Sequence, residues 1–452
     1  MEIKKDILFV SVDSHIPESN FYSVIGQQLV QQGYSVAIVT LSQQEILRHK
    51  DISVYWIGDW LPDMNSPDLI REETRILSAY GLPSLKWLWL SDRGIYRNSP
   101  QVMRRKAIAY FLAWEQIIEE MSPDYIFSDF GGELMRRVPY RVAQLQGKAY
   151  IYMDWSPIRG LFALHTSELN HWSHMQVEPF PLSDAEQEIV DHYLDTTRRQ
   201  NLSAVRFWTP QITGNRIQRL FRELYRERVI EKGEHDHFTP THWFKQYLAR
   251  MMRIPFAKRF YSKPQENEKY LFFPLHVPDD AQIPVRAPLF LQQDALVDWI
   301  ARSLPDGYML YVKEHPNFIG KYPLSFYRRI AKTAQVRFVP PYVHPHSLIK
   351  HAHAVVTINS TAGFESLLYH KPVLVLGHAS YRGYGATIDV SNINDLPFKI
   401  KEALDSPPPA WKIDRLIWSM MQASYPGRLY DFSEENLAKV ADSIHKKVQE
   451  TG

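Results

Sequence analysis

One stretch of the sequence limits the fold more than any other, VVTINSTAGFESLLYHKPVLVLGHASYRGYGATID at 355–389. It predicts a buried strand over Ala354–Ile358, a polar turn, a helix over Phe364–Tyr369, a second buried strand over Pro372–Leu376 and a glycine-rich loop over Gly377–Gly385. This order is a βαβ unit, which requires a parallel sheet covered by helices. Such a unit leaves room for a ligand at the carboxyl ends of its strands.

The turn of this unit contains the residue types of a phosphate site. Asn359, Ser360 and Thr361 precede the helix, where a hydroxyl can cap N–H groups that have no partner inside the helix, and Gly363 lets the backbone approach a ligand. Unpaired donors and the positive helix end favour phosphate. Glu365 could accept from sugar or ribose hydroxyls. A capping carboxylate and a plain strand-to-helix connection are the alternatives.

The same alternation of strands and helices precedes and follows this unit. At 452 residues the chain exceeds a single ordinary core, so the pattern predicts two doubly wound α/β halves that face a cleft. The predicted segments are an N-terminal Rossmann-like acceptor-side domain at 1–182, a helical insertion or bridge at 183–268, a C-terminal Rossmann-like nucleotide-sugar-binding domain at 269–430 and a C-terminal helix at 431–452. The first strand is not followed by GxGxxG, which disfavours a dinucleotide cofactor.

Polar residues follow several predicted strands of the first half. Asp154 ends the strand over Lys148–Met153 and is a candidate acid or base, while a loop carboxylate paired to Arg159 is the alternative. Because open α/β sheets bind ligands at strand carboxyl ends, we expect an acceptor side here. Its predicted residues are Asp13, His15, Gly131, Gly132, Glu133 and Arg159.

Two turns of the second half carry candidate catalytic groups. His315 follows the strand over Met309–Lys313 and precedes a proline, so we expect it to donate to a phosphate, a carboxylate or a leaving group; a structural histidine is the alternative. Asp279 and Asp280 are adjacent in an extended turn, so only one should face the cleft. One carboxylate pair without further ligands gives little support for a metal site, and we predict none.

Composition excludes several classes of function. The net charge is +2, which argues against a nucleic-acid binder held by a global basic field, and the absence of cysteine excludes thiol catalysis and cysteine-bound zinc. No P-loop or GxSxG elbow is present. The apolar run near the N-terminus ends at Asp13, too early for a signal peptide or a membrane span.

The basic helices predicted over 183–268 are suited to an anionic surface. Arginine, lysine and aromatic residues recur there at helical spacing, which favours contact with an anionic membrane or a polyanionic glycan. A solvated helical hairpin packed on its own domain is the alternative.

Four motifs of the second half, PLHVPDDAQI, VKEHP, INSTAGFESLLYHKPVLVLG and SYRGYGATID, occur in this order. Together they resemble the capsule polysaccharide biosynthesis family of glycosyltransferases, the retaining β-Kdo transferases, where Kdo is 3-deoxy-D-manno-oct-2-ulosonic acid. The resemblance covers about Lys269–Asp389 and is mainly architectural before that. Tyr384 replaces the family's usual tryptophan, His370 its usual glycine, and Trp155 the glycine after the acidic residue.

The resemblance implies a GT-B fold, a CMP-activated sugar donor held by the C-terminal half, and no cofactor or metal. It implies Asp280 as the nucleophile, His315 near the donor's phosphate or carboxylate, and Asp154 at the position of the family's acidic residue, the general base. The donor-binding residues predicted from it are Lys313, Asn359, Ser360, Thr361, Gly363, Glu365, Gln282, Tyr381 and Tyr384.

These observations predict a cytoplasmic glycosyltransferase of capsule or surface polysaccharide assembly, peripheral on the inner face of the membrane. Its best donor is CMP-Kdo, transferred with retention to a glycan or lipid-linked glycan. Other polysaccharide-assembly proteins are expected partners, and nucleic acid is not. A UDP- or GDP-sugar transferase or epimerase on the same scaffold, or a non-catalytic glycan-binding assembly protein, are the alternatives.

Overall fold

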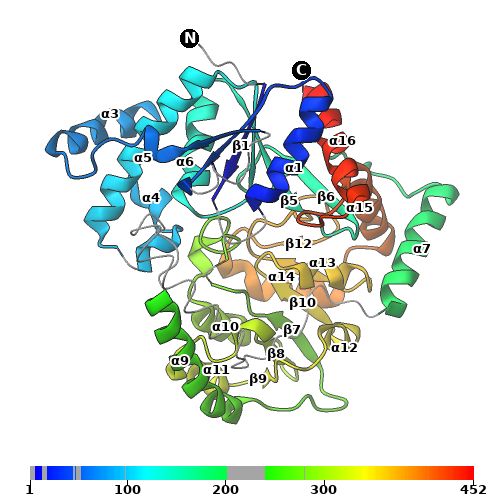
Figure 1. Cartoon of the computed structure of the whole chain (residues 1–452). Helices are drawn as coiled ribbons and strands as arrows, with labels where there is room; N and C mark the ends of the chain where they lie inside the picture. The colour runs from blue at the N-terminus through cyan, green and yellow to red at the C-terminus, as the bar shows by residue number, and fades with distance from the viewer. Residues whose placement is uncertain are drawn as a thin grey trace.

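The computed structural model describes residues 6–12, 18–43, 46, 52–96, 98–200, 240–278 and 280–451 (Figure 1). These residues form two α/β domains, each built on a mainly or wholly parallel sheet with helices on its faces. The predicted fold class, a GT-B-like pair of doubly wound domains, is confirmed.

The N-terminal sheet has seven strands in the order β13-β6-β5-β4-β1-β2-β3. The strands β5 through β3 run parallel, whereas β6 is antiparallel to both β5 and β13. All residues of β1 and β2 are buried, as their continuous apolar runs predict. The strands are β1 (Ile7–Ser11), β2 (Val36–Thr40), β3 (Ser53–Trp56), β4 (Tyr125–Asp129), β5 (Ala149–Trp155), β6 (Leu161–His165) and β13 (Tyr425–Pro426).

Local signals set the ends of the N-terminal helices. Ser99 caps the longest one, since its Oγ accepts from the N–H of Val102 at 3.3 Å, and Pro100 supplies a preset φ at the first position. Gly33, at φ +99°, ends the first helix. These helices are α1 (Glu18–Gln31), α3 (Glu72–Ala79), α4 (Lys86–Trp89), α5 (Pro100–Met121) and α6 (Leu134–Leu145).

The C-terminal sheet has six parallel strands in the order β12-β11-β10-β7-β8-β9. The predicted βαβ unit is confirmed, with a helix that begins at Thr361 rather than Phe364 because Ser360 caps it. The strands are β7 (Tyr270–Pro274), β8 (Met309–Lys313), β9 (Val336–Val339), β10 (Ala354–Thr357), β11 (Val373–Val375) and β12 (Ile388–Asp389). The helices are α10 (Gln293–Arg302), α11 (Leu324–Lys332), α12 (Pro345–His351), α13 (Thr361–Leu367) and α14 (Leu396–Asp405).

The described parts of the predicted insertion are helical. They comprise α7 (Asp184–Gln200), which packs on α15 (Ala410–Ala423), and α9 (Pro240–Ala257), which packs on α11. Residues 201–239 of this segment lie outside the described residues. Single 3₁₀ turns occur at Ile57–Asp59, Pro67–Arg71, Arg93–Tyr96, Lys258–Phe260, Pro288–Phe290, Pro316–Phe318 and Ile393–Asp395. Among the described helices, none combines the length and apolarity that a membrane span needs.

The end of the chain returns to the N-terminal domain. Tyr425 pairs with Phe162 in the sheet, and α16 (Glu434–Thr451) packs on α1. Figure 1 shows α16 beside α1, away from the C-terminal sheet. The chain therefore passes back from the C-terminal to the N-terminal domain before residue 425. The sequence-based prediction had placed residues up to 430 with the C-terminal domain. A two-residue strand gives no periodic signal that could have located it.

This return makes a prediction about stability. Ile444 on α16 is fully buried in the core that includes the β1 side chains Ile7 and Phe9, so Ile444→Ala should lower the free energy of unfolding by about 2–5 kcal/mol. Urea denaturation measures the loss. Lys446→Ala, at an exposed position of the same helix, should leave the midpoint nearly unchanged. Equal midpoints for Ile444→Ala and the unmodified protein would contradict the packing.

Candidate functional site

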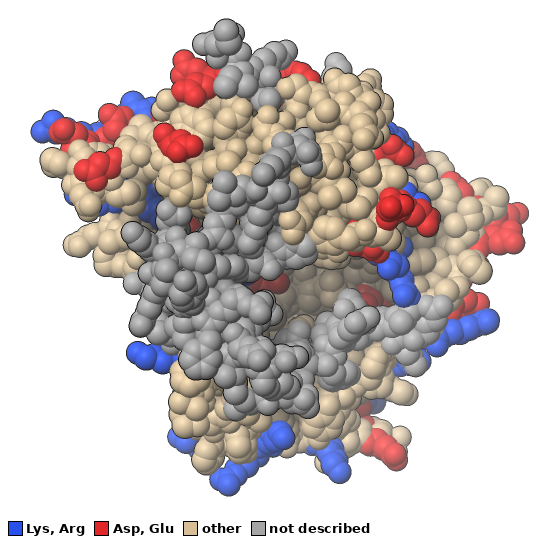
Figure 2. Space-filling view, viewed as in Figure 1, with Lys and Arg blue, Asp and Glu red and all other residues tan. Residues whose placement is uncertain are grey.

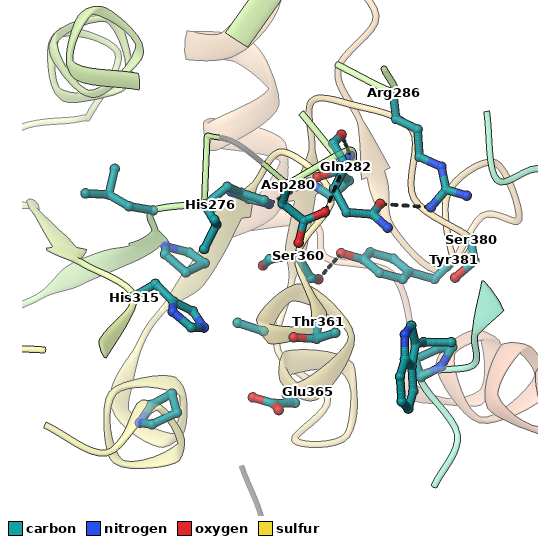
Figure 3. Close-up of a pocket in the computed structure, with 18 of the residues that line it drawn as sticks. His276, Asp280, Gln282, Arg286, His315, Ser360, Thr361, Glu365, Ser380 and Tyr381 are labelled. Atoms are coloured by element: carbon teal, nitrogen blue, oxygen red, sulfur yellow. Dashed lines mark hydrogen bonds between the residues drawn. The ribbon is translucent and has the colours of Figure 1, made fainter. Parts of the chain in front are cut away.

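A cavity of about 330 Å³ lies between the two domains, with strand ends of both contributing to its wall. Figure 2 shows a hollow between the upper and lower halves of the molecule, and Figure 3 shows the side chains that line the cavity. Ten predicted site residues line it: Asp154, Asp280, Gln282, Lys313, His315, Asn359, Ser360, Thr361, Glu365 and Tyr381. Most of the predicted site residues that the structure describes therefore line one cavity.

The turn before α13 is held by hydroxyl groups. Ser360 Oγ accepts from the N–H of Gly363 at 3.3 Å, and the N–H of Ser360 donates to Thr357 Oγ1 at 3.0 Å. The hydroxyl of Tyr381 donates to the carbonyl of Ser360 at 2.7 Å (Figure 3). A Cβ on Gly363 would lie 2.3 Å from the Tyr381 oxygen. The absence of a side chain at Gly363 thus makes room for Tyr381. The predicted role, close approach of the backbone to a ligand, is not what this glycine serves.

A second set of contacts joins this turn to the turn after β7. The N–H of Asn359 donates to His276 Nε2 at 3.2 Å, and Asn359 Nδ2 donates to the carbonyl of Gln282 at 2.7 Å. Burial, helped by the charge of His315, lowers the pKa of His276 to about 3, so its ring is a neutral acceptor. Asn359 Oδ1 is buried and accepts no hydrogen bond from a described residue. The cavity wall thus contains an acceptor that a ligand N–H or O–H could satisfy.

The end of β8 supplies the charge of the cavity. Burial lowers the pKa of Lys313 to about 8, although Glu314 and Glu365 act in the opposite direction. Burial raises the pKa of Glu314 to about 7, against hydrogen bonds from Tyr261 and Tyr327 that favour its ionised form. Burial and then the charge of Lys313 lower the pKa of His315 to about 4. At neutral pH, Lys313 is therefore charged and His315 is a neutral ring.

Asp280 stands on the turn that follows β7. Its Oδ1 accepts from the N–H of Gln282 at 3.1 Å, which fixes the carboxylate over the turn. The residue is exposed, and Figure 3 shows it in the same opening as Ser360 and His315. Asp279 lies outside the described residues, so the choice between the two aspartates stays a prediction.

Asp154 is paired with a residue of the other domain. Its Oδ2 accepts from Arg286 Nη2 at 2.6 Å and lies 3.3 Å from His165 Nε2, while Oδ1 accepts from the N–H of Trp155 at 2.8 Å. Burial alone would raise the pKa of Asp154, but Arg286 and His165 together hold it well below its usual range. The predicted alternative pairing with Arg159 is wrong. A carboxylate so firmly ionised and bonded is also a weak general base.

Arg286 connects this carboxylate to the turn that carries Asp280. It is fully buried, donates through Nη1 to Gln282 Oε1 at 2.9 Å and through Nε to the carbonyl of Glu168 at 3.2 Å, and stacks 3.4 Å from the ring centre of Phe130. Since Gln282 donates its N–H to Asp280, one chain of hydrogen bonds runs from the N-terminal domain to Asp280.

Other predicted residues lie away from the cavity. The carbonyl of Gly132 accepts from Ser91 at 2.8 Å, and Glu133 pairs with Arg136 at 3.0 Å. Tyr384 stacks on His171 with ring centres 6.3 Å apart. The residues predicted for the site that do not line the cavity are Gly131, Gly132, Glu133, Arg159, Gly363 and Tyr384. Asp13 and His15 lie outside the described residues.

The structure adds lining residues that sequence reasoning did not select. His276 follows β7 as His315 follows β8, so the strand-end argument used for His315 could have found it. Trp155 was noted only as a replacement for glycine, yet 62% of it is exposed at the cavity wall. No sequence signal marks Arg286 as buried. The further unselected residues include Ser156, Pro157, Asn170, Glu314 and Ser380.

Comparisons with known proteins agree with the motif resemblance. Residues 204–401 match the family described as "Capsule polysaccharide biosynthesis protein". The chain is 27% identical over 176 residues to capsule polysaccharide export protein KpsS of Escherichia coli, covering 36% of this chain and 45% of that protein. It is 30% identical over 127 residues to capsule polysaccharide modification protein LipB of Neisseria meningitidis, covering 26% and 30%. The chain thus spans less than half the length of these relatives. The predicted resemblance to this family is confirmed over residues 204–401.

A solved structure described as Thermosulfurimonas dismutans KpsC, beta Kdo 2,4 transferase, aligns with 69% of this chain and 81% of its own. The TM-score is 0.39 and the identity 14%, values too low to assign a donor or an acceptor.

The buried ion pair between Asp154 and Arg286 predicts that replacing Arg286 destabilises the protein. Arg286→Met leaves Asp154 buried without its cation, so we expect a loss of roughly 3–5 kcal/mol in the free energy of unfolding. Chemical denaturation measures the loss. Arg302→Met, which removes an exposed ion pair with Asp298, is the matched control and should leave the midpoint nearly unchanged.

The double variant Asp154→Asn/Arg286→Met should lose less than the sum of the two single variants, because no unpaired carboxylate remains buried. Strictly additive losses would contradict direct coupling between Asp154 and Arg286.

Proposed function

We propose, from this relationship to the capsule polysaccharide biosynthesis family, that the chain is a glycosyltransferase of capsule or surface polysaccharide assembly. The observation that carries the proposal is one interdomain cavity that holds a carboxylate, Asp280, together with a lysine, a neutral histidine and two hydroxyl residues. This is the set needed to bind an activated sugar and displace its leaving group. The best donor is CMP-Kdo.

The donor's phosphate is proposed to lie between Lys313, His315 and the Ser360–Thr361 turn. Lys313 supplies the positive charge, His315 supplies an N–H donor, and Ser360 and Thr361 supply hydroxyl groups. All four residues line the cavity. Asn359 Oδ1 is an acceptor for hydroxyl or amino groups of the donor. These residues can stabilise a departing phosphate without a metal ion.

Transfer with retention needs two inversions at the anomeric carbon. In the proposed first step the Asp280 carboxylate attacks this carbon, and the bond to the CMP phosphate oxygen breaks. In the second step an acceptor hydroxyl attacks the anomeric carbon, the bond to Asp280 breaks to release its carboxylate, and the hydroxyl proton passes to solvent. Asp154 acts through Arg286 and Gln282 to hold the Asp280 turn, which replaces the general-base role expected from the sequence. The acceptor enters from the side of Trp155 and Asn170.

The proposed location is cytoplasmic and peripheral on the inner face of the membrane. It is supported by the basic segment 198–259 in the sequence and by an expected lipid-linked acceptor.

The role of Asp280 can be separated from donor binding. Asp280→Ala should abolish transfer from CMP-Kdo, because no carboxylate remains to attack the sugar, yet leave CMP binding within a few-fold, because the proposed phosphate contacts come from Lys313, His315 and the Ser360 turn. Thermal shift measures binding, and CMP should stabilise the protein more than UDP or GDP. Intact mass with donor alone should show a sugar adduct on the unmodified protein.

Asp279→Ala is the matched control, one position earlier in the same turn, and should retain most activity. An essential Asp279 with a dispensable Asp280, or an adduct mapped to another residue, would overturn the assignment. Stronger stabilisation by UDP or GDP would instead favour a transferase or epimerase with another donor. CMP binding without turnover of any donor would point to a non-catalytic assembly protein.

Binding of CMP should also weaken in alkaline solution. The charge on Lys313 is present below its pKa of about 8 and is lost as the pH rises through that value, so affinity should fall by up to about tenfold between pH 8 and 10. Isothermal titration calorimetry measures the profile. Lys313→Arg, which stays charged, should keep its affinity across this range, and Lys313→Met should be weak and independent of pH. The same alkaline loss in Lys313→Met would exclude Lys313 as the group responsible.

A further inference from the structure

Helix α9 presents a row of large apolar side chains to the outside. Phe244, Leu248, Met252 and Phe256 follow one another at intervals of four residues, and their exposed fractions are 48%, 49%, 60% and 48%. Residues four apart lie on one ridge of a helix, so these side chains form a continuous stripe about 18 Å long. Figure 1 shows α9 at the edge of the C-terminal domain, beside α11.

The charges carried by α9 and by the turn after it have one sign. The sequence from Pro240 to Phe260 contains no aspartate or glutamate, and Lys245, Lys258 and Arg259 are exposed along it. Figure 2 shows mostly basic side chains at the lower end of the molecule, which is formed by the C-terminal domain.

The side of α9 that faces the protein is fixed to the C-terminal domain. Arg250 is buried and donates through Nε to the carbonyl of Ile319 at 2.7 Å, and Ala257 is fully buried. Gly320 lets the helix lie close, since a Cβ there would be 2.8 Å from the Arg250 carbonyl oxygen. The stripe is thus the outer face of a helix whose inner face is already packed.

We propose that the α9 face, defined as Phe244, Leu248, Met252 and Phe256 with the basic residues beside them, docks on the surface of an anionic lipid bilayer. Apolar side chains of this size enter the boundary between headgroups and acyl chains, while lysine and arginine remain at the level of the lipid phosphates. The basic residues of 240–260, a stretch without aspartate or glutamate, match such a surface. The inference deepens the proposed peripheral location by naming the face, and it does not depend on the proposed transfer reaction.

The test is flotation of the full-length protein with vesicles of phosphatidylcholine and phosphatidylglycerol at 3:1, compared with pure phosphatidylcholine. The unmodified protein should bind the anionic vesicles at least tenfold more tightly than the neutral ones. Leu248→Ser/Met252→Ser should lower binding to anionic vesicles at least tenfold. Because Leu248 and Met252 are 49% and 60% exposed, the melting temperature of this variant should stay unchanged.

Leu289→Ser is the matched control, because Leu289 is 89% exposed on the same domain but away from α9. It should change vesicle binding less than twofold. Lys258→Glu/Arg259→Glu should weaken binding as strongly as the apolar pair, which gives a second variant that leaves the stripe intact.

Equal vesicle binding by the unmodified protein and the Leu248→Ser/Met252→Ser variant would overturn the proposal. So would unchanged vesicle binding together with a change of sedimentation coefficient in that variant, since the face would then join two copies of the chain. Binding to neutral vesicles as tight as to anionic ones would also overturn it, because the basic residues of 240–260 would have no role.

Discussion

The buried contact between Asp154 and Arg286 connects the two domains where the cavity is formed. Each group is costly to bury alone, and together they are stable because Arg286 also donates to Gln282 and to the carbonyl of Glu168 and stacks on Phe130. The position of the Asp280 turn therefore depends on the N-terminal domain. Separating the domains would leave a charged pair to be resolvated and would release Gln282 from Arg286 at the same time.

The cavity combines groups whose charge is set by burial. Lys313, Glu314 and His315 are consecutive, and burial shifts the pKa of each in the direction that favours its neutral form. The pKa values are about 8, 7 and 4. All three residues line the cavity, and the Glu314 carboxylate accepts hydrogen bonds from the hydroxyl groups of Tyr261 and Tyr327. Arg286 and Lys313 supply positive charge to the lining, and Asp154, Asp280 and Glu365 supply carboxylates, so both signs of charge meet in one cavity.

The sequence located those parts of the site that follow local rules. The unit formed by β10, α13 and β11 was recognisable from apolar runs, and the Ser360 cap and His315 from their places at strand ends. The strands β6 and β13 were not predicted. β6 forms an antiparallel hairpin with β5, which departs from the alternation of strands and helices, and the two-residue β13 depends on a partner, Phe162, that is distant in sequence. Arg286 escaped for the same reason, since its partners Asp154 and Phe130 lie in another domain.

Gly320 gives α9 a further property. The hydroxyl of Tyr327 accepts from the N–H of Gly320 at 2.7 Å and donates to Glu314 at 2.6 Å, so the loop under α9 is bonded to the residue beside His315. A ligand that orders this loop and a surface that holds α9 act on one set of hydrogen bonds. Thermodynamic linkage makes such an effect reciprocal. If surface contact at α9 changes the affinity for the ligand by some factor, the ligand changes the affinity for the surface by the same factor.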